Sequence, residues 1–408
     1  MSSLVTSRPA TEAPARADGR LPLVVPVLAG GTFLMGTTEF MVAGLLPEMA
    51  DDLGVSVARA GLLITAFAVG MIIGSPAMAI LTLRMPRRLT LQLALIVFAL
   101  GHVLAAVTGR FEVILAARVL TALATGAFWS VGAVVATEAA GPAASSRALG
   151  VVIGGLTLAN VIGVPLGSFA GQLAGWQGPF WVLAVLALAA AAVIGRFIPP
   201  AQTGQAPSIR REFTALRSSD LWLALAASAL IMGGVLATYT FISPLLTEQA
   251  HIPVRLVPLV LIGFGAGALG GTLTGGRLGD RRPLAITITA AAATALVLLA
   301  LTVASGSAVL TVLLVVLMGL TGFAVNPVVT ALAVRFGGAA PTLAAALSTA
   351  GFNVGVAAGS WGAGIALDSP LGPIGPPLLG TVVAAATLVP LAALAVRKAT
   401  RTPDAHLS

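Results

Sequence analysis

One acidic side chain, Glu39, lies inside an apolar stretch that is long enough to cross a lipid bilayer. The stretch covers residues 23–46, and the hydrocarbon core of a membrane requires about 20 apolar residues. A charge near mid-membrane costs about 2.5–3.5 kcal/mol, and such residues usually face a cavity or a partner inside the protein. We therefore expect Glu39 to bind and release a proton as part of the function. The alternative is a permanently protonated carboxyl group, hydrogen-bonded within a helix bundle.

A second charge, Arg118, lies in the apolar stretch at 112–134. The first span is predicted to run outward and this one inward. At about 1.5 Å per residue, Glu39 then lies about 24 Å from the inner end of its span, and Arg118 about 10 Å from the outer end of its own. An arginine at a similar height favours the ionised form of Glu39, whereas burial favours the protonated form. A site that alternates between these conditions can exchange protons, although Arg118 could instead be a fixed ion pair or a clamp on backbone carbonyls.

The composition of the 408-residue chain is that of a polytopic membrane protein. Hydrophobic residues make up 58% and charged residues only 9%, and the mean hydropathy is +1.03, a balance that a water-soluble domain cannot bury. There is no cysteine, and His102, His251 and His406 fall in different segments, so we expect no metal site. The net charge of +8 comes from arginines spread over short loops, so we expect no nucleic-acid binding.

Twelve apolar stretches predict the membrane spans. They cover residues 23–46, 60–82, 88–107, 112–134, 147–172, 177–197, 221–248, 254–279, 283–304, 306–332, 340–367 and 374–396. The longest polar connection follows the sixth stretch. We predict an all-α membrane protein with two pseudo-symmetric six-helix halves, 23–197 and 221–396, a cytoplasmic linker at 198–220, and cytoplasmic tails at 1–22 and 397–408, the first of them disordered.

The basic residues predict the orientation in the membrane. If both termini are cytoplasmic, 18 of the 22 Lys and Arg residues lie on that side and 3 on the other, and the remaining one is Arg118. Cytoplasmic loops carry such an excess of positive charge. We therefore expect a multi-pass protein of the bacterial inner membrane with both termini inside the cell.

The two halves repeat each other, and the repeat breaks at the two intramembrane charges. The residues at 45–50 recur in pattern at 245–250, which is 200 residues further on. Such duplication is typical of secondary transporters whose site lies between the halves. Two aligned pairs break the pattern: Glu39 with Tyr239, and Arg118 with Leu314. We infer that ion coupling belongs to the first half and that the second half supplies more of an apolar substrate wall.

The fifth span carries small residues and a proline that favour a gate between the halves. They are Gly154, Gly163, Pro165 and Gly167. Glycines allow helices to approach closely, and proline removes a backbone hydrogen bond and permits a bend. Plain tight packing would explain the glycines as well.

The loops after the second and eighth spans hold clustered basic residues. The first contains Arg84, Arg87 and Arg88, and the second contains Gly276, Asp280 and Arg281. Basic residues in these loops are signals of topology. Asp280 could also cap a helix end or pair with an arginine and so latch one conformation. Leu83 takes the place of the acid in the first copy, so we expect a latch only in the second.

These motifs resemble the major facilitator superfamily, and within it the twelve-span drug:proton antiporters. Residues 276–281 match the loop signature of the family, Arg118 matches its span-four arginine, and residues 160–167 resemble its span-five antiporter motif. The stretches at 36–56 and 61–74 are similar to chloramphenicol-resistance exporters of actinomycetes. The first stretch is also shared with arabinose-type and nucleoside-type effluxers.

The resemblance implies a monomeric transporter that exports a small amphiphilic drug, chloramphenicol above others, in exchange for protons and by alternating access. It implies no cofactor besides the proton. Glu39 would carry the proton and Arg118 would tune its affinity. Candidates for the substrate pocket are Phe33, Thr38, Phe40, Asn160, Tyr239 and Asn353, although aromatic residues in spans more often serve packing.

Two other classes of function remain as alternatives. The first is a sugar or nucleoside effluxer of the same fold, in which Glu39 and the asparagines would bond hydroxyl groups. The second is a membrane-embedded enzyme or a sensor, which would need a larger polar cluster or a soluble output domain than the sequence offers. The role of the acids at the outer mouth, Glu48, Asp51 and Asp52, stays open.

Overall fold

The computed structural model describes residues 21–82, 85–141, 144–198, 217–338 and 341–401, and every regular element in these ranges is a helix. The first half contains α1 (Val24–Met41), η1 (Val42–Gly44), α2 (Leu46–Asp52), α3 (Val57–Leu81), α4 (Arg87–Val107), α5 (Phe111–Ala140), α6 (Ser145–Leu158), η3 (Ala159–Gly163), α7 (Val164–Ala174) and α8 (Gln177–Phe197). The second half contains α10 (Ser219–Thr240), α11 (Ile242–Pro244), η5 (Leu245–Gln249), η6 (Val254–Leu256), α12 (Val257–Gly279), α13 (Pro283–Ala304), α14 (Ala308–Phe336), α15 (Pro341–Leu367), η7 (Gly372–Ile374), α16 (Gly375–Ala386) and α17 (Leu388–Arg401).

Twelve helical segments within the described residues are long and apolar enough to cross a membrane, which confirms the predicted all-α fold. The first and seventh spans end earlier than expected, at Gly44 and Thr240, because the chain leaves the regular helix there and continues in short separate helices whose first residues, Leu46 and Ile242, are still apolar. Most of the predicted tails and linker, at 1–20, 199–216 and 402–408, lies outside the described residues. Helix α17 continues to Arg401, past the predicted end at residue 396.

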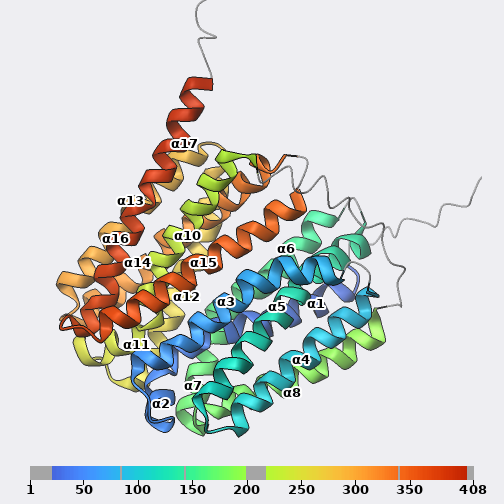
Figure 1. Cartoon of the computed structure of the whole chain (residues 1–408), viewed down its shortest axis with the longest axis horizontal. Coiled ribbons are helices and arrows are strands. Elements are labelled where there is room, and N and C mark those ends of the chain that lie inside the picture. Colours follow the sequence, from blue (N-terminus) through green and yellow to red (C-terminus); the bar gives the residue numbers. More distant parts are fainter. Residues whose placement is uncertain (1–20, 83–84, 142–143, 199–216, 339–340, 402–408) are drawn as a thin grey trace, which may run out of the picture.

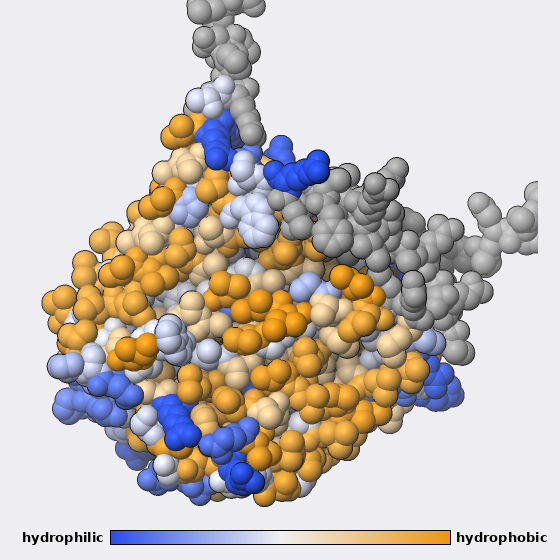
Figure 2. Space-filling model, in the orientation of Figure 1, coloured by the Kyte–Doolittle hydropathy of each residue, from blue (hydrophilic) through white to orange (hydrophobic). Residues whose placement is uncertain are grey.

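The outer surface has the apolar character that a bilayer requires. In lipid, backbone polar groups must be bonded within the protein, so a long apolar stretch forms a helix. Large side chains such as Leu104, Val185 and Val303 are exposed on α4, α8 and α13. Figure 2 shows orange, hydrophobic side chains over the middle of the visible face and blue, hydrophilic ones at its ends.

The helices of the two halves pack in the same pairs. Helix α3 packs against α5 and α4 against α8, as α12 packs against α14 and α13 against α16. Glycines permit the closest of these contacts at equivalent positions. A Cβ on Gly70 would lie 2.6 Å from the Cβ of Ala122, and one on Gly267 would lie 2.2 Å from the carbonyl oxygen of Val316. The structural repeat therefore follows the repeat in the sequence.

The halves meet through α3 with α15 and through α12 with η3 and α7. Figure 1 shows α2 and α11 together at one end of the bundle, which we call the α2–α11 end; the linker end is the opposite one, where α8 ends and α10 begins. Polar contacts between the halves gather towards the α2–α11 end. The hydroxyl oxygens of Thr65 and Ser360 are 2.7 Å apart, and Gln172 Nε2 donates to the Val254 carbonyl at 2.9 Å.

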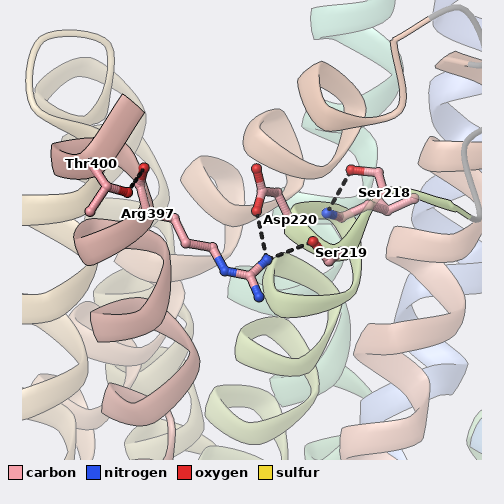
Figure 3. A network of polar contacts seen from close by, with 6 residues as sticks. Ser218, Ser219, Asp220, Arg397 and Thr400 are labelled. Carbon is pink, nitrogen blue, oxygen red and sulfur yellow. Dashed lines mark hydrogen bonds and ion pairs between the residues drawn. The ribbon is translucent and has the colours of Figure 1, made fainter. Parts of the chain in front are cut away.

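At the linker end, a polar network joins the first and last spans of the second half (Figure 3). The Ser218 hydroxyl caps α10 by accepting a hydrogen bond from the Leu221 N–H at 3.3 Å. Arg397 Nη1 on α17 donates to Ser219 Oγ at 2.6 Å and pairs with Asp220 Oδ1 at 3.1 Å. An acid in the first turn is also favoured by the helix dipole. The network therefore fastens α17 to the start of α10.

Candidate functional site

The candidate site is built on the end of α1. Beyond Met41 the α-helix gives way to the 3₁₀ turn η1, and the last carbonyls of an α-helix have no partner within it. One of them, Thr38 O, accepts a hydrogen bond from Arg118 Nη1 at 3.1 Å. A cation is favoured at this negative end of the helix dipole. The change from an α-helix to a 3₁₀ turn after Met41 therefore leaves the carbonyl oxygen of Thr38 as an acceptor for Arg118.

Arg118, on α5, is buried with 2% of its surface exposed. Its Nη1 also donates to Thr38 Oγ1 at 3.1 Å, its Nε donates to the Leu63 carbonyl at 3.2 Å, and its guanidinium lies 4.4 Å from the centre of the Phe67 ring. Nη2 has no hydrogen-bond partner within the described part of the chain. Arg118 thus holds backbone carbonyls in this conformation, which is one of the two roles that the sequence left open, and both N–H donors of Nη2 remain available.

Glu39, on α1, lies beside Arg118 and is also buried, with 4% of its surface exposed. Its carboxyl group interacts electrostatically with Arg118, but among the described residues it makes no hydrogen bond or ion pair. An ionised carboxylate in such a place would need a hydrogen-bond donor. The Nη2 group of Arg118 is a donor that could serve.

His102 on α4 completes the polar cluster, and sequence reasoning did not include it. It is 1% exposed; its Nε2 lies 2.8 Å from Thr38 Oγ1 and its Nδ1 lies 2.7 Å from the Phe98 carbonyl oxygen. The position of His102 inside an apolar span was a signal that could have found it, because a titratable residue there costs free energy and is often functional. The cluster of Arg118, Thr38 and His102 thus joins α5, α1 and α4.

Two of the predicted pocket residues meet across the interface between the halves. The rings of Phe40 and Tyr239 have centroids 6.1 Å apart in a T-shaped contact. Tyr239 stacks on Phe264 at 4.4 Å, and Phe264 contacts Phe323 at 5.9 Å. Phe40 and Tyr239 are both buried, so this aromatic row closes the contact between the halves in this conformation.

The other predicted pocket residues lie in different surroundings. The hydroxyl group of Thr38 is bonded within the polar cluster, and the Phe33 ring lies against Gly163. Asn160 is in the π-helix η3, where its backbone carbonyl faces Gly265 of α12. Asn353 is 1% exposed and donates from Nδ2 to the Thr349 carbonyl at 2.9 Å, while its Oδ1 has no partner among the described residues.

The small residues of the fifth span contact α1 closely, with one exception. A Cβ on Gly163 would lie 2.0 Å from Thr37 Oγ1, and one on Gly167 would lie 3.3 Å from Met41. Gly154, which the sequence included in the gating or packing motif, makes no close contact, because it is exposed and a Cβ there would meet nothing within 4 Å. Its neighbour Gly155 takes the contact, at 2.2 Å from the Ala29 carbonyl oxygen.

The bend expected at Pro165 has a clear local form. The proline lies in the first turn of α7, and the π-helix η3 precedes it directly. A π-helical turn interrupts the regular ladder of an α-helix and is frequent at functional sites. Because η3 also contacts α12, the irregular turn lies at the interface between the halves.

The basic loops are only partly described. Arg84 lies outside the described residues, and Arg87 forms an ion pair with Glu138 that ties α4 to α5. Asp280 is exposed at the end of α12 next to Arg281 and, as far as the described chain extends, its carboxylate makes no ion pair. Arg88 lies near Gly195, and a Cβ on Gly276 would meet nothing within 4 Å. The latch at Asp280 stays a prediction.

The acids at the α2–α11 end have distinct surroundings. Asp52 Oδ2 accepts hydrogen bonds from Trp176 Nε1 at 2.8 Å and from Gln177 Nε2 at 3.1 Å. Glu48 and Asp52 line an open cavity of about 480 Å³ together with Val254 of the second half. Partial burial raises the pKa of the Glu48 carboxyl group above its ordinary value. Asp51 is exposed.

Twelve helices in two repeated halves, with a buried acid and arginine in one of them, define a secondary transporter. The chain belongs to the Major Facilitator Superfamily, whose sequence profile matches residues 28–360. It is therefore a membrane transporter of the bacterial inner membrane and not an enzyme.

Relatives agree with this assignment. A chloramphenicol resistance protein of Streptomyces lividans is 37% identical over 374 residues, which cover 90% of this chain and 95% of the relative. The inner membrane transport protein YdhP of Escherichia coli K12 is 32% identical over 362 residues, covering 89% and 93% of the two chains.

Solved structures share the fold at low sequence identity. The crystal structure of the nucleoside transporter NupG matches with a TM-score of 0.72 and 13% identity, covering 91% of this chain and 99% of that one. A bacterial homologue of the human lysosomal transporter Spinster, in an inward-facing and occupied conformation, matches with a TM-score of 0.71 and 17% identity, covering 93% and 97%.

Proposed function

We propose that this transporter exports a small, largely neutral amphiphile, chloramphenicol above others, in exchange for protons that enter the cell. It would work as a monomer with both termini in the cytoplasm. The similarity to the chloramphenicol resistance protein supports the substrate, because it extends over 90% of this chain. The excess of arginine at the linker end supports the orientation.

The observation that carries the coupling is the arrangement of Glu39 and Arg118. Arg118 is held by Thr38 and Leu63 while its Nη2 is unpartnered, and Glu39 is buried beside it without a hydrogen bond among the described residues. When Glu39 carries a proton, the two groups can stay apart. When the proton leaves, the carboxylate can pair with Nη2. The site would thus have two arrangements that differ by one proton, as proton-coupled transport requires.

The contacts between the halves support an inward-facing conformation. The bonds Thr65–Ser360 and Gln172–Val254 and the aromatic contact Phe40–Tyr239 all lie towards the α2–α11 end, which the proposed orientation places outside the cell. Breaking these contacts would open the outer side. The π-helical turn of the fifth span, which touches α12, would be one of the surfaces that move.

Unpartnered polar atoms support a substrate with both polar and apolar parts. Within the described residues, Trp129 Nε1, Asn326 Oδ1 and Asn353 Oδ1 are buried without a hydrogen-bond partner. Buried polar groups are nearly always bonded, and the exceptions need an explanation. An amphiphile with hydroxyl or amide groups would supply partners to α5, α14 or α15.

The driving force is adequate for resistance. One charge that moves through 100 mV supplies about 2.3 kcal/mol. This free energy can maintain a ratio of about fifty between the substrate concentrations on the two sides of the membrane.

Chloramphenicol accumulation in cells that express the protein tests the proposal. Wild type, Glu39→Gln and the control Glu112→Gln are compared with and without a protonophore; Glu112 is an exposed acid, paired with Arg59 at 3.2 Å. We expect wild type and Glu112→Gln to lower accumulation, and Glu39→Gln or the protonophore to abolish the effect. If wild type leaves accumulation unchanged, the drug is wrong, and sugars and nucleosides are tested next. If Glu39→Gln exports as well as wild type, Glu39 does not couple transport to protons.

A further inference from the structure

His102 lies in the interior of the first half, away from water. Its ring packs against Phe98, with centroids 4.1 Å apart, and against Phe180 of α8, at 5.6 Å. Its polar contacts are the Phe98 carbonyl at 2.7 Å and the Thr38 hydroxyl at 2.8 Å. Both ring nitrogens are therefore occupied, and neither faces the interface between the halves.

These two contacts define how the protons are placed. A carbonyl oxygen only accepts hydrogen bonds, so Nδ1 of His102 carries a hydrogen and donates to Phe98 O. In the neutral ring, Nε2 is then an acceptor, and the Thr38 hydroxyl must donate to it. A doubly protonated ring would instead place a second cation against the hydroxyl group that Arg118 already contacts at 3.1 Å. The geometry thus favours a neutral ring that accepts from Thr38.

Thr38 behaves differently from its neighbours because of this acceptor. In helices, threonine hydroxyls usually donate to the carbonyl four residues earlier. On the same helix, Thr32 donates to Leu28 O at 3.0 Å and Thr37 to Phe33 O at 2.8 Å. The hydrogen of Thr38 is given to His102 instead, which leaves its lone pairs for Arg118 Nη1. Without His102, Thr38 would turn to Leu34 O, and Arg118 would lose one of its acceptors.

We propose that His102 is a positioning residue for proton exchange: through the Thr38 hydroxyl it holds Arg118 on the end of α1 and so opposes the pairing of Arg118 with Glu39. This inference rests on the proposed function, because it assigns His102 a part in the same coupling site. Removal of His102 would release Arg118 towards Glu39 and stabilise the ionised carboxylate. Proton uptake, and the transport that depends on it, would then require a lower pH.

Other charged groups on the neighbouring helices are too distant or already paired. Arg59 of α3 is paired with Glu112 of α5 at 3.2 Å, and Tyr239 of α10 reaches Phe40 but not the cluster by any contact of the described residues. The remaining charged residues of these helices lie at the linker ends: Arg87 and Arg88 of α4, Glu138 of α5, Arg147 of α6 and Arg196 of α8. Arg118 and Glu39 are therefore the charges that His102 can influence directly.

The test measures the pH profile of exchange in proteoliposomes that contain the full chain and chloramphenicol. We expect His102→Leu to move the pH of half-maximal exchange down by about one to two units, the effect of losing one hydrogen bond to a charged group, with little change in the KM for the substrate. His102→Gln can accept from Thr38 and donate to Phe98 O, so it should keep the wild-type profile. Thr38→Val should shift the profile like His102→Leu, and the double variant should shift it no further.

Several outcomes would overturn the inference. They are an unshifted profile for His102→Leu, or for Thr38→Val where His102→Leu does not fold, and a shift in His102→Gln equal to that in His102→Leu. Thr38→Val is nearly isosteric and serves if His102→Leu does not fold. Glu39→Gln separates the two proposals. If exchange by Glu39→Gln still depends on pH, the proposed coupling through Glu39 fails as well. If exchange by Glu39→Gln no longer depends on pH and His102→Leu shows no shift, only the role of His102 fails.

A second measurement does not depend on transport. The chain has 3 histidines, so ¹⁵N labelling of histidine gives few signals, and the one lost in His102→Gln is that of His102. We expect a neutral ring with the hydrogen on Nδ1. A ring protonated on Nε2 would overturn the inference.

Discussion

The contact between the two halves includes a glycine, Gly265, that leaves no room for a side chain. A Cβ there would lie 2.5 Å from the Asn160 carbonyl oxygen and 2.8 Å from the Cα of Val161. Both atoms belong to the backbone of the π-helix η3 in the other half, so a flexible side chain cannot relieve the clash. Gly265→Ala should therefore act as a wedge that disfavours the closed arrangement.

The size of the effect follows from the cost of overpacking. Extra methyl groups in a close-packed interior cost about 1–3 kcal/mol, which changes an equilibrium constant about 5- to 150-fold. The assay uses the absence of cysteine in the natural sequence. Thr65→Cys and Ser360→Cys replace hydroxyl groups whose oxygens are 2.7 Å apart, so oxidation should link the two halves whenever the α2–α11 end is closed.

Gly154→Ala is the matched control. It makes the same change in the fifth span, whose backbone faces Gly265, and its Cβ would meet nothing within 4 Å. We expect the cross-linking rate of the double-cysteine protein to fall with Gly265→Ala, by at most about 5- to 150-fold, and to stay unchanged with Gly154→Ala. An equal rate in all three proteins would refute the reasoning, because the α2–α11 end would then close without needing the space at Gly265.

Two further predictions concern stability, measured as the thermal unfolding of the purified protein in detergent. Gly155→Ala should lower the unfolding temperature, because its Cβ would lie 2.2 Å from the Ala29 carbonyl oxygen, whereas Gly154→Ala, with nothing within 4 Å, should not; equal effects of the two would contradict the packing of α6 on α1. Asp220→Asn should lower the unfolding temperature by more than Glu112→Gln does. The Asp220 side chain is 10% exposed in its pair with Arg397, whereas Glu112 is 65% exposed in its pair with Arg59. Exposed pairs contribute only about 0–1 kcal/mol to stability.

The spans could be predicted from the sequence because length and apolar character alone define them. The predicted stretches 177–197, 254–279 and 283–304 coincide with the spans of the structure. A similar height of Glu39 and Arg118 in the membrane could also be predicted, since the rise of a helix and the alternating direction of the spans fix the height of each residue. The height of a residue in the membrane can thus be predicted from its position along the sequence alone.

The direction in which a side chain points around its helix was not predictable in the same way. Spans that are apolar on every side do not reveal which face is turned inward. For this reason Gly154 was chosen where Gly155 makes the contact, and the proximity of His102 to Thr38 was missed. The acceptors of Arg118 could not be foreseen either, because Thr38 O is available only where α1 ends in the turn η1.

The end of α1 connects the proposed proton site to the interface between the halves. Thr38 and Glu39 belong to the site, the next residue, Phe40, contacts Tyr239 of α10 at 6.1 Å, and a Cβ on Gly44 would lie 3.0 Å from Leu261 of α12. These residues span the transition from α1 to η1, where the backbone is least constrained by helical hydrogen bonds. A rearrangement of Arg118 that releases Thr38 O would therefore act directly on the segment that holds the two halves together. The second half contributes apolar partners there, with Tyr239 opposite Phe40, so one charged site suffices to bias the contact. This accounts physically for a repeat that is kept in the packing and lost at the two charges.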